Sequence, residues 1–144
     1  GAGQMRGGFS LDYELELRNG EALASFVMDH GRFGPQGALG GRDGDVNKVV
    51  VLRDGTSYVP EHLSKEQDIA LAPGDRVWVR TPGGGGYGDP LQRPLDAVCE
   101  DVRLNRYSAA QARDLFGVVV DDEHPSGVDK PATKRLRQDM RRHS

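Results

Sequence analysis

Hydrophobic and polar residues alternate strictly over residues 9–17. The apolar positions are Phe9, Leu11, Tyr13, Leu15 and Leu17. This period of two predicts a β-strand with one buried face and one solvated face. Asn19-Gly20 follows and is a preferred two-residue hairpin turn. We therefore expect residues 22–28 to return as the partner strand, with Tyr13 opposite Phe26 and Leu11 opposite Met28.

Short apolar runs on either side of turn sequences predict further strands as far as residue 82. Residues 49–52 and 57–59 flank Asp54-Gly55, a second hairpin signal. Residues 68–71 and 76–80 flank Pro73-Gly74, which favours a turn. Closely spaced strands joined by turns are typical of antiparallel sheets, so residues 1–82 are predicted to form a sandwich or a partial barrel.

The hydrophobic period changes after residue 94. Leu95, Val98, Cys99 and Val102 recur at the spacing of one helix face. Ser108 and Gln111 form a capping-box pattern that starts a second helix, which Gly117 ends. Residues 130–142 are consistent with a third helix of marginal independent stability. The predicted class is α+β: an antiparallel β-rich unit followed by two or three short C-terminal helices.

Glycine is the unusual feature of the composition, at 20 of 144 residues, about twice ordinary usage. Fifteen of these glycines fall in three glycine segments: Gly1, Gly3, Gly7 and Gly8; Gly31, Gly34, Gly37, Gly40, Gly41 and Gly44; and Gly83, Gly84, Gly85, Gly86 and Gly88. The single cysteine, Cys99, excludes an internal disulfide. No apolar run approaches the roughly 20 residues of a membrane span.

Charge is distributed unevenly. The chain carries −3 overall, while residues 130–144 contain six basic residues and one acidic residue. A basic tail can contact nucleic acid or a membrane surface. This tail has no aromatic residue for base stacking and its apolar stripe is narrow, so we favour a solvated helix or a tail that docks on an acidic partner. We expect no nucleic-acid or membrane partner and a cytoplasmic location.

Candidate chemistry is sparse. Gly83–Gly88 satisfies G-x-G-x-x-G, but a run of glycines does so trivially, and a dinucleotide site needs a parallel βαβ unit. A tight loop against another backbone is the favoured interpretation. The four histidines lack metal-ligand spacing, so no metal site is expected. His30, beside Asp29 and Arg32, is a candidate site residue, although a surface polar cluster is favoured there.

Five segments together resemble one family. They are Gly1–Gly8, Asp29–Gly41, Pro73–Val77, Thr81–Leu91 (TPGGGGYGDPL) and Tyr107–Val120. In order and spacing they resemble the C-terminal part of the hydantoinase B family. That family includes N-methylhydantoinases, 5-oxoprolinases and the related subunits of acetone and acetophenone carboxylases. The resemblance covers residues 1–121 and defines one domain, with a β unit at 1–82, a glycine loop at 83–90 and helices at 94–117. Residues 122–144 form an acidic linker and a basic tail or helix.

The resemblance implies an ATP-dependent complex. A hydantoinase A-type partner would handle ATP, and the phosphorylated carbonyl or enolate would then be hydrolysed or carboxylated. ATP with magnesium, and a metal ion, would belong to partner subunits, and this chain alone would bind no cofactor. The chain is therefore interpreted as a small subunit, or split C-terminal piece, that completes a truncated hydantoinase B-type chain in a hetero-oligomeric acetone/acetophenone carboxylase-like enzyme. Two alternatives remain: part of a hydantoinase/5-oxoprolinase-type cyclic amide hydrolase, and a non-catalytic assembly module.

The candidate residues lie in the glycine segments and their neighbours. Backbone N–H groups of glycine loops can bind phosphate or carboxylate, and arginine can pair with the same anions. The candidates for a substrate-proximal or interface role are Arg6, Gly7, Gly8, His30, Arg32, Arg42, Gly83, Gly84, Gly85, Gly86, Tyr87 and Asp89. The residues do not define a catalytic group.

Overall fold

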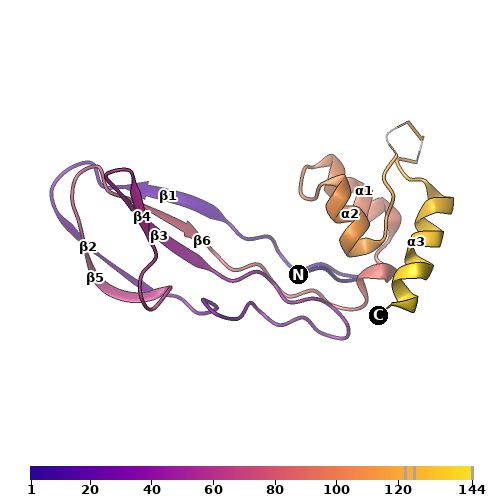
Figure 1. Ribbon diagram of the computed structural model, residues 1–144, viewed down its shortest axis with the longest axis horizontal. Coiled ribbons are helices and arrows are strands. Elements are labelled where there is room, and N and C mark those ends of the chain that lie inside the picture. The colour runs from indigo at the N-terminus through magenta and orange to yellow at the C-terminus, as the bar shows by residue number, and fades with distance from the viewer. Residues whose placement is uncertain (122, 125, 144) are drawn as a thin grey trace. The chain divides into compact units, whose positions relative to one another are not determined.

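The computed structural model describes residues 1–121, 123–124 and 126–143 (Figure 1). Residues 122, 125 and 144 of the predicted linker and tail lie outside the described residues. The elements are β1 (Asp12–Glu16), β2 (Ala22–Val27), β3 (Lys48–Arg53), β4 (Thr56–Tyr58), β5 (Lys65–Leu71), β6 (Arg76–Arg80), the 3-10 helix η1 (Pro90–Gln92), α1 (Leu95–Arg103), α2 (Ala109–Phe116) and α3 (Lys130–Arg142). Antiparallel strands followed by three α-helices in these residues confirm the predicted α+β class. No described helix is long and apolar enough to cross a bilayer.

The chain divides into two compact units that interleave along the sequence. The β unit comprises Gly1, Gly7–Gln36 and Asp43–Gly85, and the helical unit comprises Ala2–Arg6, Gly37–Arg42 and Gly86–Ser144. The boundaries fall within the glycine segments. Each unit is therefore assembled from separate stretches of chain.

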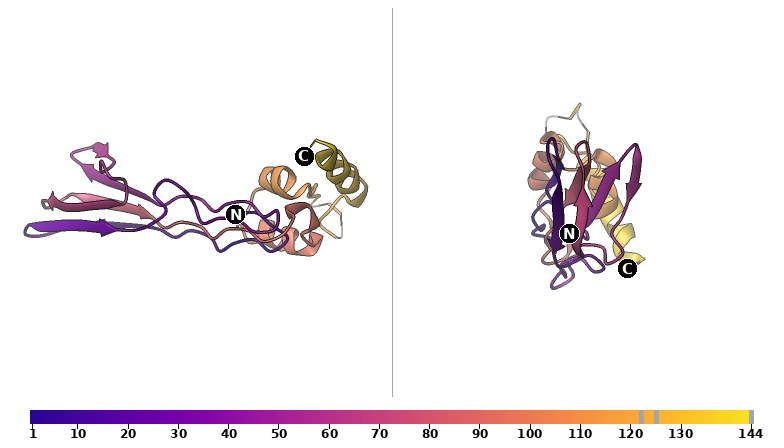
Figure 2. Two further views of the ribbon diagram at one scale, coloured as in Figure 1. Left: turned by 90° about the horizontal axis from the view of Figure 1, so that it is seen from below. Right: turned by 90° about the vertical axis from the view of Figure 1, so that its left-hand side faces the viewer.

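The β unit contains two antiparallel sheets. One has the strand order β1-β6-β3-β4 and the other pairs β2 with β5. In Figure 2 the indigo β1 lies beside the rose β6, from a distant part of the chain. Buried valines of β3 and β6 pack against Ile69 of β5 and Phe26 of β2. The sheets thus share one core, as in a sandwich.

The second predicted hairpin is confirmed. Arg53 of β3 pairs with Thr56 of β4. The two loop residues, Asp54 and Gly55, have φ values of +49° and +73°, as a type I′ turn requires.

The first predicted hairpin is wrong. β1 pairs with β6, so that Tyr13 is opposite Val79, while β2 pairs with β5, so that Ala24 is opposite Ile69. Gly20 still turns the chain, with φ of +73°. The turn leads from one sheet to the other, because each strand finds an apolar partner that is distant in sequence.

The prediction that residues 9–17 bury their apolar face is also wrong. Every residue of β1 is exposed, and Leu11 and Leu15 are 61% and 62% exposed. The core that β2 and β5 cover draws its buried valines from β3 and β6 and includes no residue of β1. The alternating pattern correctly predicts a strand, but nothing in the described chain covers its apolar side.

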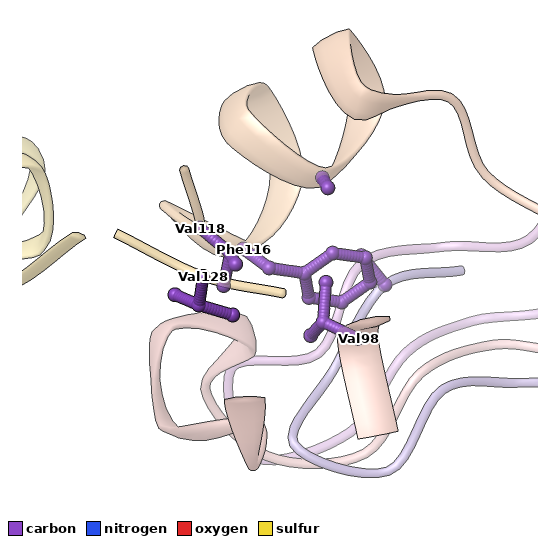
Figure 3. Packing of buried hydrophobic residues seen from close by; sticks show 6 residues of the cluster. Val98, Phe116, Val118 and Val128 are labelled. Atoms are coloured by element: carbon purple, nitrogen blue, oxygen red, sulfur yellow. The ribbon is translucent and has the colours of Figure 1, made fainter. Parts of the chain in front are cut away.

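The helical unit has a separate core around Phe116 (Figure 3). Phe116 at the end of α2 contacts Val98 of α1 and the extended residues Val118 and Val128, all of which are buried. Tyr107 meets the Phe116 ring edge to face, with centroids 5.3 Å apart. The capping box of Ser108 and Gln111 is present. The helix that the capping box and Gly117 predict is therefore confirmed as α2.

A buried carboxylate joins the segments of the helical unit. Asp101 of α1 accepts hydrogen bonds from Arg6 (2.9 and 3.1 Å), Arg93 (2.8 Å) and Arg106 (3.2 Å). Burial alone would raise the pKa of Asp101, but hydrogen bonds from Arg6 and Arg106 and the charges of Arg6 and Arg93 together lower it below its ordinary value. The ionised form is therefore favoured in the fold.

We predict that Asp101→Asn destabilises the 144-residue chain by about 3 kcal/mol at pH 7, because arginines lose a buried charge partner. A lowered folded pKa stabilises the fold above the unfolded pKa of about 3.9, and this contribution is lost as pH falls through the folded pKa. Denaturant unfolding of both proteins at pH 7 and pH 3 should show the difference shrinking at pH 3. An equal difference at both pH values would contradict this role for Asp101.

Candidate functional site

The glycine segments pack backbone to backbone within each unit. In the β unit, a Cβ added to Gly7 would lie 2.0 Å from the Gly84 carbonyl oxygen, and one added to Gly44 would lie 2.1 Å from that of Gly83. In the helical unit, a Cβ at Gly41 would lie 2.1 Å from the Gly86 carbonyl oxygen. Real Cβ atoms do not approach other atoms so closely, so these positions require glycine.

Several N–H groups of the third glycine segment are donated to other carbonyl groups. Gly84 donates to Gly8 (3.0 Å) and Gly83 to Asp45 (3.3 Å) in the β unit. Gly86 donates to Arg42 (2.8 Å) in the helical unit. A backbone anion site requires N–H groups that point at the ligand. These three already serve the packing of the backbone.

Gly8 lies in open space, whereas Gly85 takes part in a close backbone contact. Gly8 has nothing within 4 Å of an added Cβ. The carbonyl oxygen of Gly85 lies 2.8 Å from an added Cβ on Gly7, so it belongs to the same contact. Gly34 and Gly37 of the second glycine segment show the same close packing, since an added Cβ would lie 1.8 Å from the Gly44 carbonyl oxygen and 2.2 Å from that of Gly41, respectively.

The other candidates in the helical unit have different surroundings. Arg6 forms a bidentate pair with Asp101. Asp89 caps η1 by accepting from the Leu91 N–H at 2.8 Å. Arg42, whose side chain is exposed, lines a pocket of about 350 Å³ together with Asp89 and Arg141. Tyr87 forms backbone bridges to Met5 and Ala38 while its side chain is half exposed. Arg42 and Asp89 thus share a pocket that Arg6 and Tyr87 do not line.

His30 and Arg32 lie on a fixed loop of the β unit. The carbonyl oxygen of Met28 accepts from the Ser64 hydroxyl (3.0 Å), and that of Asp29 accepts from the Asn47 side chain. Ser64 and Asn47 are both buried. His30 adopts a φ of +68°, a left-handed conformation that is uncommon in non-glycine residues, although histidine adopts it more often than most, and that clusters at functional sites. The two buried side chains hold the loop in this conformation.

This loop forms one wall of an open pocket of about 340 Å³. Arg32 and the largely exposed Phe33 line it from one side, and His62 and Lys65 line it from the other. Lys65 pairs with Asp29 at 2.7 Å. This hydrogen bond and the Lys65 charge hold the pKa of Asp29 below its ordinary value. The pocket therefore combines an anionic carboxylate with several basic groups.

The His30 ring has a defined orientation. Its Nδ1 lies 3.1 Å from the carbonyl oxygen of Phe33. A carbonyl oxygen only accepts, so this contact places a proton on Nδ1, and in the neutral ring Nε2 carries the lone pair. His30 is exposed. The ring could thus accept a proton from a ligand in the pocket.

Sequence reasoning missed the supporting residues Asn47, Ser64 and Asp101. No motif marks them, because each has a partner distant in sequence: Asp29 for Asn47, Met28 for Ser64 and Arg6 for Asp101. Cys99 lies on α1 beside the core, and burial raises the pKa of its thiol. Among the described residues, no group of three or more histidine, cysteine, aspartate or glutamate side chains could hold a metal ion.

Comparisons with known proteins agree with one another. The model of the family described as hydantoinase B/oxoprolinase matches residues 1–90. The chain is 38% identical over 129 residues to the caprolactamase subunit beta of Pseudomonas jessenii, covering 84% of this chain and 21% of that subunit.

Two solved structures are similar. The crystal structure of the ATP-dependent caprolactamase from Pseudomonas jessenii matches with a TM-score of 0.72 and 33% identity, over 95% of this chain and 24% of that one. A nucleotide-free acetone carboxylase structure matches with a TM-score of 0.60 and 19% identity, over 85% of this chain and 22% of that one, which shows a shared fold. The chain spans about a quarter of the length of these relatives.

The matching segments include the glycine segments that pack together in the structure. Residues 1–90 amount to more than half of the chain. The chain belongs to the hydantoinase B/oxoprolinase family.

Proposed function

We propose that this chain forms the C-terminal part of a B-type subunit in an ATP-dependent complex that hydrolyses a cyclic amide. The similarity to a caprolactamase, at 38% identity over 129 residues, carries this proposal. A caprolactamase, by its name, acts on a lactam, which is a cyclic amide. In such a complex, the B-type subunit would be joined by a hydantoinase A-type subunit that handles ATP.

Among the described residues, the third glycine segment does not suit a nucleotide phosphate and no side-chain cluster suits a metal ion. Three of the glycine N–H groups are donated to carbonyl oxygens, and no metal-ligand cluster exists among the described residues. We therefore assign ATP, magnesium and any metal ion to partner subunits. The glycine segments would pack the chain into the subunit.

We place substrate contact at the loop of residues 29–33. Its backbone is fixed by Asn47 and Ser64, which suits a group that must be positioned accurately. Arg32 could pair with a phosphorylated carbonyl oxygen. His30 could exchange a proton through Nε2. These roles are proposed for the open pocket that both residues line.

Carboxylation is the second candidate reaction, and an assembly role without catalysis is the third. The match to acetone carboxylase shows a shared fold, which is compatible with either reaction. At 19% identity that match is weaker in sequence than the match to caprolactamase at 33%. Hydrolysis is thus the leading proposal.

The reaction is tested on the complete assembly that contains this chain. With ATP and magnesium, we expect ADP release coupled to ring opening of caprolactam, hydantoin or 5-oxoproline. Carbon incorporation from bicarbonate into acetone, without ring opening, would overturn the hydrolase proposal. The isolated 144-residue chain should not turn over ATP, and turnover by it would contradict our assignment of ATP to a partner.

Neighbouring glycines give a matched test of the packing role. We predict that Gly7→Ala destabilises the chain by about 3 kcal/mol, because its Cβ would overlap the Gly84 carbonyl group. Gly8→Ala, with nothing within 4 Å of its Cβ, should change stability by less than about 0.5 kcal/mol. Denaturant unfolding measures both. Equal effects would contradict backbone packing at Gly7.

The loop is tested with His30→Asn and Arg32→Gln in the complete assembly. Asparagine tolerates the positive φ of His30, so the fold should remain. We expect each variant to lower kcat/KM at least about tenfold, since each loses a positioned group. Arg18→Gln, at an exposed arginine of the same unit, is the control and should retain activity. Unchanged kcat/KM in both loop variants would favour the assembly role.

A further inference from the structure

The strand β1 and the residue before it expose an apolar stripe, which we define as Leu11, Tyr13 and Leu15. Their side chains are 61%, 39% and 62% exposed. Phe9, at 47% exposure, precedes them in the same alternation. Exposed apolar residues are ordinary when scattered, but a contiguous row on one strand marks an interaction surface.

The stripe continues the buried face of the four-stranded sheet. Tyr13 lies opposite Val79 and Leu15 lies opposite Val77. Directly paired residues of antiparallel strands share a face, and both valines are buried in the core. The covering layer has two strands, β2 and β5, over a sheet of four. The sandwich is therefore incomplete over β1.

The opposite face of β1 already has polar partners. Asp12 accepts two hydrogen bonds from Arg80, at 2.7 and 2.6 Å, and Glu14 accepts one from Arg76 at 3.1 Å. β1 is also the edge strand of its sheet, with β6 as its one strand partner among the described residues. The strand thus has a solvent face and an apolar face that lacks a cover.

We propose that the stripe is the surface on which the remainder of a B-type subunit packs, through an apolar-faced strand that extends the layer of β2 and β5 across β1. The proposal rests on the proposed function, since that assigns the chain to a larger subunit. The caprolactamase subunit that it resembles is about four times longer, so most of such a subunit lies outside these 144 residues. A second copy of this chain is a poorer occupant, because the three side chains of the stripe, even with Phe9, offer far less than the roughly 800 Å² per partner that a stable dimer buries.

Hydroxyl-radical footprinting compares the 144-residue chain with the complete assembly. We expect oxidation of Leu11, Tyr13 and Leu15 to fall at least about fivefold in the assembly, because buried side chains lose access to the radical. Leu23 and Val27, which are 67% and 80% exposed on β2, are the internal controls and should keep their reactivity. An unprotected stripe, or equal protection at Leu23 and Val27, overturns the proposal.

A matched pair of double variants tests the same surface by assembly. Leu11→Lys/Leu15→Lys should lower recovery of the assembled subunit at least about tenfold, while Leu23→Lys/Val27→Lys should assemble normally. Both should unfold within a few degrees of the parent as isolated chains, since the replaced side chains are exposed. Normal assembly of the first variant overturns the proposal. The proposal is also overturned if sedimentation shows that the isolated chain self-associates and footprinting shows that this self-association protects the stripe.

The test of the packing surface can fail independently of the test of the proposed reaction. If the assembly opens the ring while the stripe stays reactive toward hydroxyl radical, the proposed packing surface is wrong and the proposed reaction is supported. A protected stripe in an assembly that carboxylates acetone would support the surface and overturn the hydrolase proposal.

Discussion

The structure depends on glycine backbones that lie too close together for any Cβ. At Gly7, Gly41 and Gly44 an added Cβ would stand about 2 Å from a carbonyl oxygen of the Gly83–Gly86 segment. Such contacts let chain segments join each unit without intervening side chains. Hydrogen bonds from Gly83, Gly84 and Gly86 to carbonyl groups on the neighbouring segments fix the alignment. The fold therefore requires glycine for close approach at these positions.

The close backbone packing distinguishes two kinds of candidate site residue: the glycines themselves and the polar side chains beside them. Gly83, Gly84 and Gly86 resemble a phosphate loop by pattern, yet their N–H groups are donated to carbonyl oxygens. His30 and Arg32, which the sequence offers as candidates without a catalytic motif, lie on a loop held by buried side chains and open to a pocket. The polar groups that could meet a ligand thus lie beside the glycines rather than in them.

Local signals in the sequence predict the elements well and their partners poorly. The capping box of α2 and the Asp54-Gly55 hairpin depend on neighbours in sequence, and both are present. The pairing of β1 with β6 depends on residues 60 or more positions apart, which no turn motif specifies. The exposure of Leu11 and Leu15 has the same origin, because an alternating pattern shows which face is apolar and not what covers it.

The central claim is that the glycine segments serve backbone packing. Hydrogen exchange at the amides of Gly83, Gly84 and Gly86 tests it most directly, with Gly20 at an exposed turn as the reference. We expect slow exchange at the three amides, with protection close to that of the core strand β6, and no change on addition of ATP. Exchange as fast as at Gly20, or protection that appears only with ATP, would contradict it.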